Sequence, residues 1–313
     1  MIKKILILII AAGILIFLGA FLYFREYQNL PEFAMPLLSE AKIPGLGEKV
    51  IIFAPHSDDE TLGAGGYIAK AVKNGAEVVV VLVTNGDGHR FSSMEEFKKL
   101  YPNSEDYIKS GLSRQEESKK ALAILGVKPE NIIFLGYPDL GLKELLKNNW
   151  QNDYQSPYTK RDSSPYENSY HQNVSYTGEN LQNDLIDLLK KYHPTVVIAS
   201  SQSDIHSDHA ATGVFIQKAV DAIDGQKPQI YFYLIHFRHF PNPKGLHQDR
   251  MLSSPAKLIN VSDGILKVSL DKETMEKKEK ALSEYKSQLK VPMLKNLMES
   301  FLRQNELLFQ TRS

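Results

Sequence analysis

The chain has 313 residues, 37 basic and 37 acidic side chains, and no cysteine. This length allows one large domain or two small ones with a sizeable core. Zero net charge gives no indication of a nucleic-acid partner, and the lack of cysteine excludes disulfides and thiolate metal sites, so a metal would have to be held by His, Asp or Glu.

The first 25 residues predict a single-pass membrane anchor. Lys3 and Lys4 precede an uncharged apolar run over residues 5–24, close to the ~20 residues that a membrane-spanning helix needs. A cleaved signal peptide would have an apolar core of roughly 7–15 residues and a small-residue cleavage site, so we favour an uncleaved anchor over residues 1–25. The lysines favour a cytoplasmic N-terminus and an extracytoplasmic remainder; a cytoplasmic-facing remainder is the alternative.

After this anchor, residues 26–48 predict a tether and residues 49–313 predict one domain. Strands are expected at 50–54, 77–84, 131–135, 195–199 and 229–235, and helices at 62–73, 113–125, 181–192, 210–223 and 293–309. Ser113 is the expected N-cap of its helix, because Glu116 completes a capping-box pattern. Alternating strands and helices predict an α/β fold with a largely parallel sheet.

Residues 148–179 interrupt this alternation with a polar stretch rich in tyrosine. A loop of this length inside a compact domain is either functional or disordered. Aromatic rings among hydrogen-bonding side chains suit sugar binding, so we predict a loop on the substrate side of the domain. An ordinary surface loop is the alternative interpretation.

A turn rich in charged side chains, residues 55–63, follows the first predicted strand of the domain. It holds His56 and three consecutive carboxylates at 58–60, and it leads directly into the helix at 62–73. Ligands bind at the carboxyl ends of strands in open α/β sheets, and acids this close repel one another unless a cation or hydrogen bonds offset their charge. The turn therefore predicts a metal site.

A second cluster, Asp204, His206, Asp208 and His209, occupies the equivalent position after the strand at 195–199. Catalytic zinc takes three protein ligands and leaves one position for water. The first cluster can supply an imidazole and a carboxylate, and the second another imidazole. A remaining carboxylate can act as general base and a remaining imidazole can stabilise an oxyanion or donate a proton. This set predicts metal-assisted hydrolysis of an amide or ester; hydrogen-bonded acids at helix N-termini are the structural alternative.

The two clusters together resemble those of a known family. Residues 55–60 resemble the His-Pro-Asp-Asp-Glu signature of the PIG-L/LmbE-like zinc N-deacetylases, and residues 206–209 resemble their His-Pro-Asp-His motif. The resemblance covers roughly residues 48–310, with Ser57 and Ser207 where the family motifs have proline. Supporting matches lie at 114–117, 135–139 and 285–288.

This resemblance implies a Rossmann-like three-layer α/β/α sandwich that holds one Zn²⁺ per chain, with other divalent metals as substitutes. The implied metal ligands are His56, Asp59 and His209. Because adjacent residues point in different directions, only one of the two aspartates joins His56 easily, and the family pattern makes that one Asp59.

The resemblance also implies roles for the remaining side chains. Asp58 would be the general base that deprotonates the attacking water. His206 would stabilise the oxyanion or protonate the leaving amine, with Asp208 orienting it. Arg114 and Asp139 would bind substrate.

From these residues we predict a zinc-dependent hydrolase that removes the N-acetyl group from an N-acetylglucosamine-type amino sugar. The anchor indicates a glycoconjugate of the membrane or cell envelope as substrate. One alternative is a zinc-dependent amidase or esterase acting on a non-sugar. The other is a non-catalytic glycan-binding protein, which would be expected to lack a ligand or the base.

Overall fold

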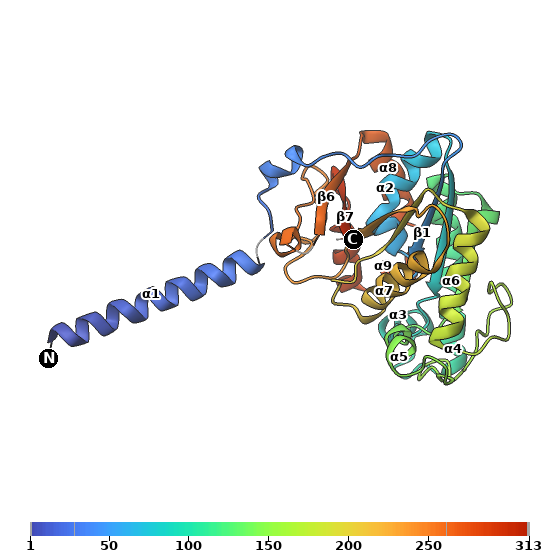
Figure 1. The fold of residues 1–313 in the computed structure, drawn as a ribbon. Coiled ribbons are helices and arrows are strands. Elements are labelled where there is room, and N and C mark those ends of the chain that lie inside the picture. The colour runs from blue at the N-terminus through green and yellow to red at the C-terminus, as the bar shows by residue number, and fades with distance from the viewer. Residues whose placement is uncertain (1, 28, 261, 312–313) are drawn as a thin grey trace.

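A computed structural model describes residues 2–27, 29–260 and 262–311, and in the N-terminal helix the side chains of residues 9–20 and 22. In this part of the chain the centre of the molecule is a β-sheet (Figure 1). It has seven strands in the order β3-β2-β1-β4-β5-β7-β6. The strands are β1 Lys49–Ala54, β2 Glu77–Thr84, β3 Ile132–Tyr137, β4 Val196–Ser200, β5 Gln229–Tyr233, β6 Ser262–Ser269 and β7 Asn305–Thr311. The first five are parallel, whereas β7 runs antiparallel to β5 and β6.

Helices cover both faces of the sheet. The helices are α2 Asp59–Lys73, α3 Arg90–Phe97, α4 Ser104–Leu125, α5 Leu142–Lys147, α6 Gly178–Tyr192, α7 Ser207–Ala222, α8 Lys272–Leu282, α9 Lys286–Leu289 and α10 Pro292–Glu299. Helices α2, α4 and α8 contact one another on one side, and α5, α6 and α7 do so on the other. The predicted α/β sandwich with a mostly parallel sheet is confirmed.

The order of strands reverses at β1. This strand pairs in parallel with β2 on one edge and with β4 on the other. Strands β2 and β3 therefore lie on one side of β1, and the next strands in the sequence, β4 and β5, lie on the other side. Ligands bind at such a switch point, in the crevice outside the carboxyl ends of the strands. The two charged clusters follow β1 and β4, so this topology brings them together.

Burial on both faces explains why the central strands are continuous apolar runs. In β1 every residue from Val50 to Ala54 is fully buried. Helix α2 packs closely against β5, because a Cβ at Gly63 would lie 2.4 Å from the ring of Tyr233. This close approach needs glycine, and it fixes the start of α2, from which the first cluster projects.

Two expectations about helices are wrong. Helix α4 begins at Ser104 and is capped by a box between Asn103 and Asp106, so Ser113 lies inside it. The helix predicted at 293–309 ends at Glu299, and its second half is the strand β7. Tertiary pairing overrides helical propensity there, because β7 fills the place between β5 and β6.

Helix α1 (Ile2–Tyr27) projects away from the folded body (Figure 1). The side chains over residues 9–20 and at Leu22 are exposed. Among the residues described, no helix has both the length and the apolar character required to cross a membrane. The structure thus gives no support to the predicted transmembrane anchor over residues 1–25.

The segment predicted as a tether lies along β6. Its short 3₁₀ helix, Glu32–Leu37, buries Met35 completely. The Nζ of Lys267 in β6 donates hydrogen bonds to the carbonyl oxygens of Pro36 and Leu38. Residues 29–43 are therefore packed against the domain.

Within the segment 148–179, the aromatic side chains are anchored to the domain. The ring of Trp150 stacks on a phenylalanine of α7 with 6.1 Å between centroids. The hydroxyl of Tyr166 donates to Asp87, and that of Tyr176 donates to the carbonyl of Gly136. The predicted role of this segment in substrate binding stays a prediction.

Candidate active site

The first cluster is organised by the turn between β1 and α2. Asp59, the first residue of α2, accepts a hydrogen bond at Oδ2 from the backbone N–H of His56, 3.0 Å away. Asp58 has a φ of 118°. Residues other than glycine rarely adopt this backbone conformation, which costs ~1–3 kcal/mol. This strained backbone turns the carboxylates of Asp58 and Asp59 in different directions.

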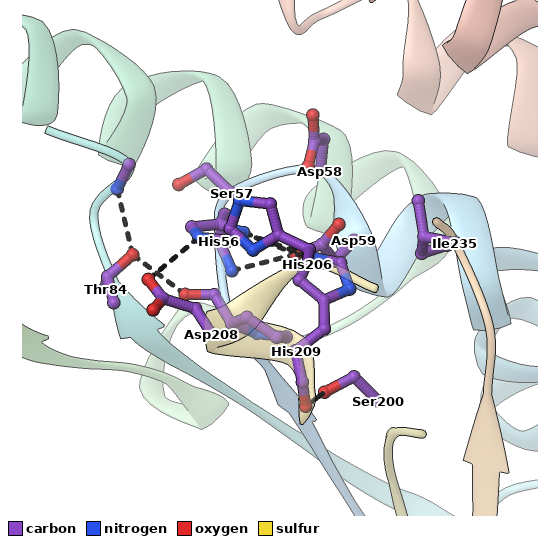
Figure 2. A network of polar contacts seen from close by, with 12 residues as sticks. His56, Ser57, Asp58, Asp59, Thr84, Ser200, His206, Asp208, His209 and Ile235 are labelled. Atoms are coloured by element: carbon purple, nitrogen blue, oxygen red, sulfur yellow. Dashed lines mark hydrogen bonds and ion pairs between the residues drawn. The ribbon is translucent and has the colours of Figure 1, made fainter. Parts of the chain in front are cut away.

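Three polar atoms of the predicted metal ligands converge. The Oδ2 of Asp59 lies 3.0 Å from Nδ1 of His56 and 3.1 Å from Nε2 of His209, and these two nitrogens are 3.2 Å apart (Figure 2). In a tetrahedral zinc site with bonds of 2.0–2.2 Å, the ligand atoms lie roughly 3.3–3.6 Å apart. A small outward movement of these side chains would therefore fit a zinc ion at the centre of the triangle.

The electrostatics of this triangle favour a positive charge. Burial opposes charge on His56, but the carboxylates of Asp139, Asp208 and Asp59 raise its pKa well above the usual value. Burial is likewise outweighed at His209, whose pKa rises to about 10, and at Asp59, whose pKa falls well below its usual value. Without a metal, the two imidazoles retain protons that a divalent cation would displace.

The second nitrogen of each ligating histidine faces a carboxylate. Nε2 of His56 lies 3.1 Å from Oδ1 of Asp139 and 3.4 Å from Oδ2 of Asp208. Nδ1 of His209 lies 3.2 Å from Oδ2 of Asp204. Metal-bound histidines almost always have such a partner, which orients the ring and raises its basicity. This arrangement is what a metal site with His56 and His209 as ligands requires.

Asp139 and Asp208 both contact the ring of His56. Asp139 is only 3% exposed; it faces His56 and also lines the cavity, so its predicted contact with substrate stays a prediction. Asp208 contacts His56 and accepts hydrogen bonds from the backbone N–H groups of Leu140 and Leu142. Its predicted role in orienting His206 stays a prediction. Both carboxylates therefore hold the His56 ring in place.

His56, Asp139 and Asp208 also form a group whose ligand atoms converge. In this group the oxygens of Asp208 are already engaged by two backbone N–H groups. We therefore regard the triangle of His56, Asp59 and His209 as the better metal site.

Arg114 donates hydrogen bonds to the backbone of two loops that border the site. Its Nη1 donates to the carbonyl of Gly86 at 2.7 Å, and its Nη2 donates to the carbonyl of Ser57 at 3.1 Å. The guanidinium is 5% exposed and ties together the loops that follow β1 and β2. A Cβ at Gly86 would lie 2.1 Å from the guanidinium carbon. Arg114 also lines the cavity, so its predicted contact with substrate stays a prediction.

Asp58 stands apart from the triangle, at the cavity. Nε2 of Gln288 donates both to Asp58 and to the carbonyl of Ser57. Burial and the neighbouring carboxylate raise the pKa of Asp58 well above its usual value. The third acid of the turn, Glu60, is bound by the hydroxyl of Tyr285 and takes no part in the cavity. Asp58 is therefore the acid of this turn left for proton transfer.

A cavity of about 180 Å³ opens beside the triangle. Pockets that enclose whole drug-sized ligands are roughly 300–1,000 Å³, so this one suits an acyl group and the adjoining part of its carrier. One wall is apolar and is built largely by α10. The apolar side chains are Leu62, Leu140, Ile235, Leu294, Leu297 and Met298.

Two further histidines face this cavity beside the triangle. The ring of His206 packs edge-on to that of His56, with 4.8 Å between centroids, and His236 lies 5.3 Å from His206. Burial, and then the charge on His56, lower the pKa of His206 to about 4. Burial, and then the charge on His209, lower the pKa of His236 to about 3. At neutral pH both rings are uncharged hydrogen-bonding groups.

Asp204 had no assigned role, and His236 and His89 were missed entirely. His236 follows β5 and His89 follows β2, and both side chains line the cavity. Each therefore comes from the carboxyl edge of a strand in the same sheet as β1 and β4. A position just after a predicted strand was the sequence feature that could have indicated both histidines. It indicates the site only when the order of the strands in the sheet is known.

Residues 51–220, more than half of the chain, match the family described as PIG-L: GlcNAc-PI de-N-acetylase. The chain belongs to this family. PIG-L relatives among characterised proteins include the diacetylchitobiose deacetylase of Thermococcus kodakarensis, 31% identical over 123 residues that cover 37% of this chain and 42% of the relative. The 1D-myo-inositol 2-acetamido-2-deoxy-alpha-D-glucopyranoside deacetylase of Mycobacterium sp. (strain KMS) is 28% identical over 199 residues, 63% of this chain and 56% of the relative. The chain thus spans about half the length of the curated relatives it matches.

Solved structures of deacetylases resemble this PIG-L chain in fold. The A40926 pseudoaglycone deacetylase has a TM-score of 0.51 and 15% identity, over 84% of this chain and 96% of that chain. A deacetylase of the teicoplanin biosynthesis pathway has a TM-score of 0.51 and 16% identity, over 80% of this chain and 89% of that chain. At these identities the likeness establishes the α/β fold alone.

Proposed function

We propose that this PIG-L chain is a zinc-dependent N-deacetylase that hydrolyses the acetamido group of an N-acetylglucosamine-type sugar. The observation that carries the proposal is the triangle of His56 Nδ1, Asp59 Oδ2 and His209 Nε2 beside a cavity. All three are ligand atoms that zinc accepts. Asp58 lies at the same cavity without joining the triangle, as a general base must.

Zinc bound at the triangle would lower the pKa of a water molecule to about 7 and polarise the acetyl carbonyl. In the proposed reaction, Asp58 takes the proton from the attacking water on a carboxylate oxygen. The neutral ring of His206 donates an N–H hydrogen bond to the carbonyl oxygen as it gains negative charge. The C–N bond then breaks, the proton taken from water passes to the amine, and the products are acetate and the free amino sugar.

The substrate class is supported by the relatives rather than by the cavity. Both are named as deacetylases, of diacetylchitobiose and of an acetamido sugar joined to inositol. We therefore propose an N-acetylated amino sugar as the substrate of this chain. We further propose that this sugar is part of a glycoconjugate of the membrane or envelope. No nucleic-acid partner is proposed, because the net charge is zero.

The test uses the full-length chain loaded with zinc. N-acetylglucosamine, diacetylchitobiose and an N-acetylglucosaminyl lipid are incubated with the protein, and the release of free amine and acetate is measured. Hydrolysis of an acetamido sugar is expected, and Asp58→Asn should lose it while retaining zinc. Turnover of only non-sugar acetamides or esters would favour the amidase or esterase alternative. No turnover of either class by the zinc-bound protein would favour the glycan-binding alternative.

We propose separately that residues 1–25 hold the protein at a membrane with the domain outside the cytoplasm. The support is the apolar sequence after Lys3 and Lys4 and the exposure of its side chains, among them Ile14, Ile16 and Phe17. Expression of the full chain, followed by fractionation and an alkaline wash, tests the attachment, and protease treatment of intact cells tests the side. Recovery in the soluble fraction would refute the attachment, and protection from protease would reverse the orientation.

A further inference from the structure

His89 lies in the wall of the active-site cavity, although no sequence motif indicated it. It ends the loop at residues 85–89 that follows β2, and it is the N-cap of α3. Its side chain accepts a hydrogen bond at Nδ1 from the backbone N–H of Ser92, 3.2 Å away. The imidazole therefore takes the place of the Ser, Thr, Asp or Asn that usually caps a helix.

This cap determines which ring nitrogen carries the proton. A backbone N–H can only donate, so Nδ1 of His89 must present its lone pair. The hydroxyl of Ser92 lies 2.8 Å from the same nitrogen and can donate to it as well. Burial, and then the charge of Arg114, lower the pKa of His89 to about 4. The neutral ring consequently carries its proton on Nε2, the nitrogen that the cap leaves without a partner, and His89 is one of the residues that line the cavity.

The loop that carries His89 is fixed relative to the metal triangle. The backbone N–H of Gly88 donates to Oδ2 of Asp139 at 2.8 Å, while Oδ1 of the same carboxylate lies 3.1 Å from His56 Nε2. A Cβ at Gly88 would lie 3.1 Å from Oδ2 of Asp139, a tight contact that would shift one of the two groups by a few tenths of an ångström. The carboxylate of Asp139 thus links the residue before His89 to His56, a predicted metal ligand. This link fixes the position of the His89 ring relative to the metal triangle.

The side-chain nitrogens of Arg114 and Gln288, which also line the cavity, are largely engaged. Both terminal nitrogens of Arg114 donate to backbone carbonyls. The amide of Gln288 donates to Ser57 and Asp58. Asp58 itself is an acceptor when ionised. An oxygen-rich ligand needs donors, and Nε2–H of His89 is a donor that this wall can offer.

We propose that His89 is a substrate-binding residue whose Nε2–H donates to a hydroxyl or ring oxygen of the amino sugar while the acetamido group lies at the metal triangle. This inference rests on the proposed function and deepens it, because it assigns recognition of the sugar to a residue outside the two histidine motifs. His89 would then discriminate acetamido sugars from acetamides without a sugar.

The decisive variant is His89→Asn. Asparagine is a good N-cap and can accept from the Ser92 N–H through its side-chain oxygen, but it is too short to present the Nε2 donor. Loss of one neutral hydrogen bond to the sugar should lower kcat/KM for acetamido sugars by about 2- to 13-fold. KM should carry this change and kcat should stay within about twofold, as for lost ground-state binding. The value for a simple acetamide such as acetanilide should not change.

Two further variants separate recognition from structure. His89→Gln keeps a side-chain N–H donor on a longer side chain and should recover part of the lost kcat/KM. His193→Asn is the matched control, because it changes a histidine at the other kind of helix end, the C-cap of α6, and should leave both substrates unaffected. Unchanged kcat/KM for sugars in His89→Asn, or an equal loss for sugar and non-sugar substrates, would overturn the inference.

Binding of diacetylchitobiose to the zinc-loaded proteins, measured by calorimetry, keeps this inference distinct from the proposed function. The dissociation constant should be about 2- to 13-fold higher in His89→Asn than in the wild type. A wild type that binds the sugar without hydrolysing it would refute the deacetylase activity and leave the role of His89 standing. A wild type that binds no sugar, or equal affinities in the two proteins, would refute the role of His89.

Discussion

Asp139→Asn is the most informative change at the metal site, because it preserves shape and removes charge. Oδ1 of Asp139 faces His56 Nε2 at 3.1 Å, and Oδ2 accepts from the backbone N–H of Gly88 at 2.8 Å. Both neighbours act as donors when Nδ1 of His56 is the metal ligand. An amide has only one accepting end, so the variant cannot satisfy both.

Either orientation of the new amide has a cost. If its oxygen accepts from Gly88, its NH₂ points at His56 Nε2 and favours the tautomer with the proton on Nδ1, the atom needed by the metal. If its oxygen accepts from His56, its NH₂ faces the N–H of Gly88. Removing such a partner of a metal-bound histidine typically weakens metal affinity 10–100-fold, which is about 1.4–2.8 kcal/mol.

Titration of zinc-free protein with Zn²⁺ against a chromophoric chelator measures this affinity directly. The matched control is Asp184→Asn, which alters a carboxylate of similar burial that accepts from the hydroxyl of Tyr137 away from the triangle. The control should bind zinc as the wild type does. If the folded Asp139→Asn protein bound zinc within threefold of the wild type, the placement of the metal on Nδ1 of His56 would be refuted.

Three other variants test separate parts of the account. Asp58→Asn should lower turnover by at least 100-fold, in line with the ~10²–10⁴-fold contribution of a general base, and keep zinc, as measured by bound-metal analysis; loss of zinc instead would make Asp58 a ligand. Asp87→Asn concerns a buried carboxyl whose pKa is raised to about 7 by burial and by Asp139. Because the folded state binds this proton more tightly than the unfolded state, its ionisation destabilises the fold as pH rises from about 4 to 7. In urea titrations of zinc-free protein, the variant should therefore gain stability over the wild type across that range, and a pH-independent difference would refute the assignment. Lys278→Met leaves Glu306, its buried partner at 2.6 Å, unpaired and should cost about 3–5 kcal/mol of unfolding free energy, whereas combining it with Glu306→Gln should cost less; equal losses would argue against the pair.

The central strands could be predicted because burial on two faces leaves a direct mark on the sequence. Val50 to Ala54 and the run at 77–84 are apolar at nearly every position, and few other structures require that. The C-terminal strand β7 gives no such signal. It contains Glu306, whose charge is satisfied by Lys278 and by backbone N–H groups of α2. A buried charge of this kind is visible only once its partner from another element is known.

The same limit applies to the site. The motifs identified which side chains meet, because each cluster follows a strand and leads into a helix. They could not distinguish a side chain that touches substrate from one that holds a ligand in place. The structure adds that Asp139 and Asp208 contact His56 and that Arg114 contacts the backbone of two loops. Their predicted roles toward substrate and His206 stay predictions. That distinction depends on side-chain direction, which sequence spacing does not specify.

The central claim is that one zinc ion is bound by Nδ1 of His56, Oδ2 of Asp59 and Nε2 of His209. Anomalous diffraction from zinc-loaded crystals, collected on both sides of the zinc absorption edge, tests it most directly. A single strong peak is expected about 2.0–2.2 Å from each of these three atoms. A peak on the other side of the His56 ring, between Nε2, Asp139 and Asp208, would contradict it, as would the absence of zinc from the cavity.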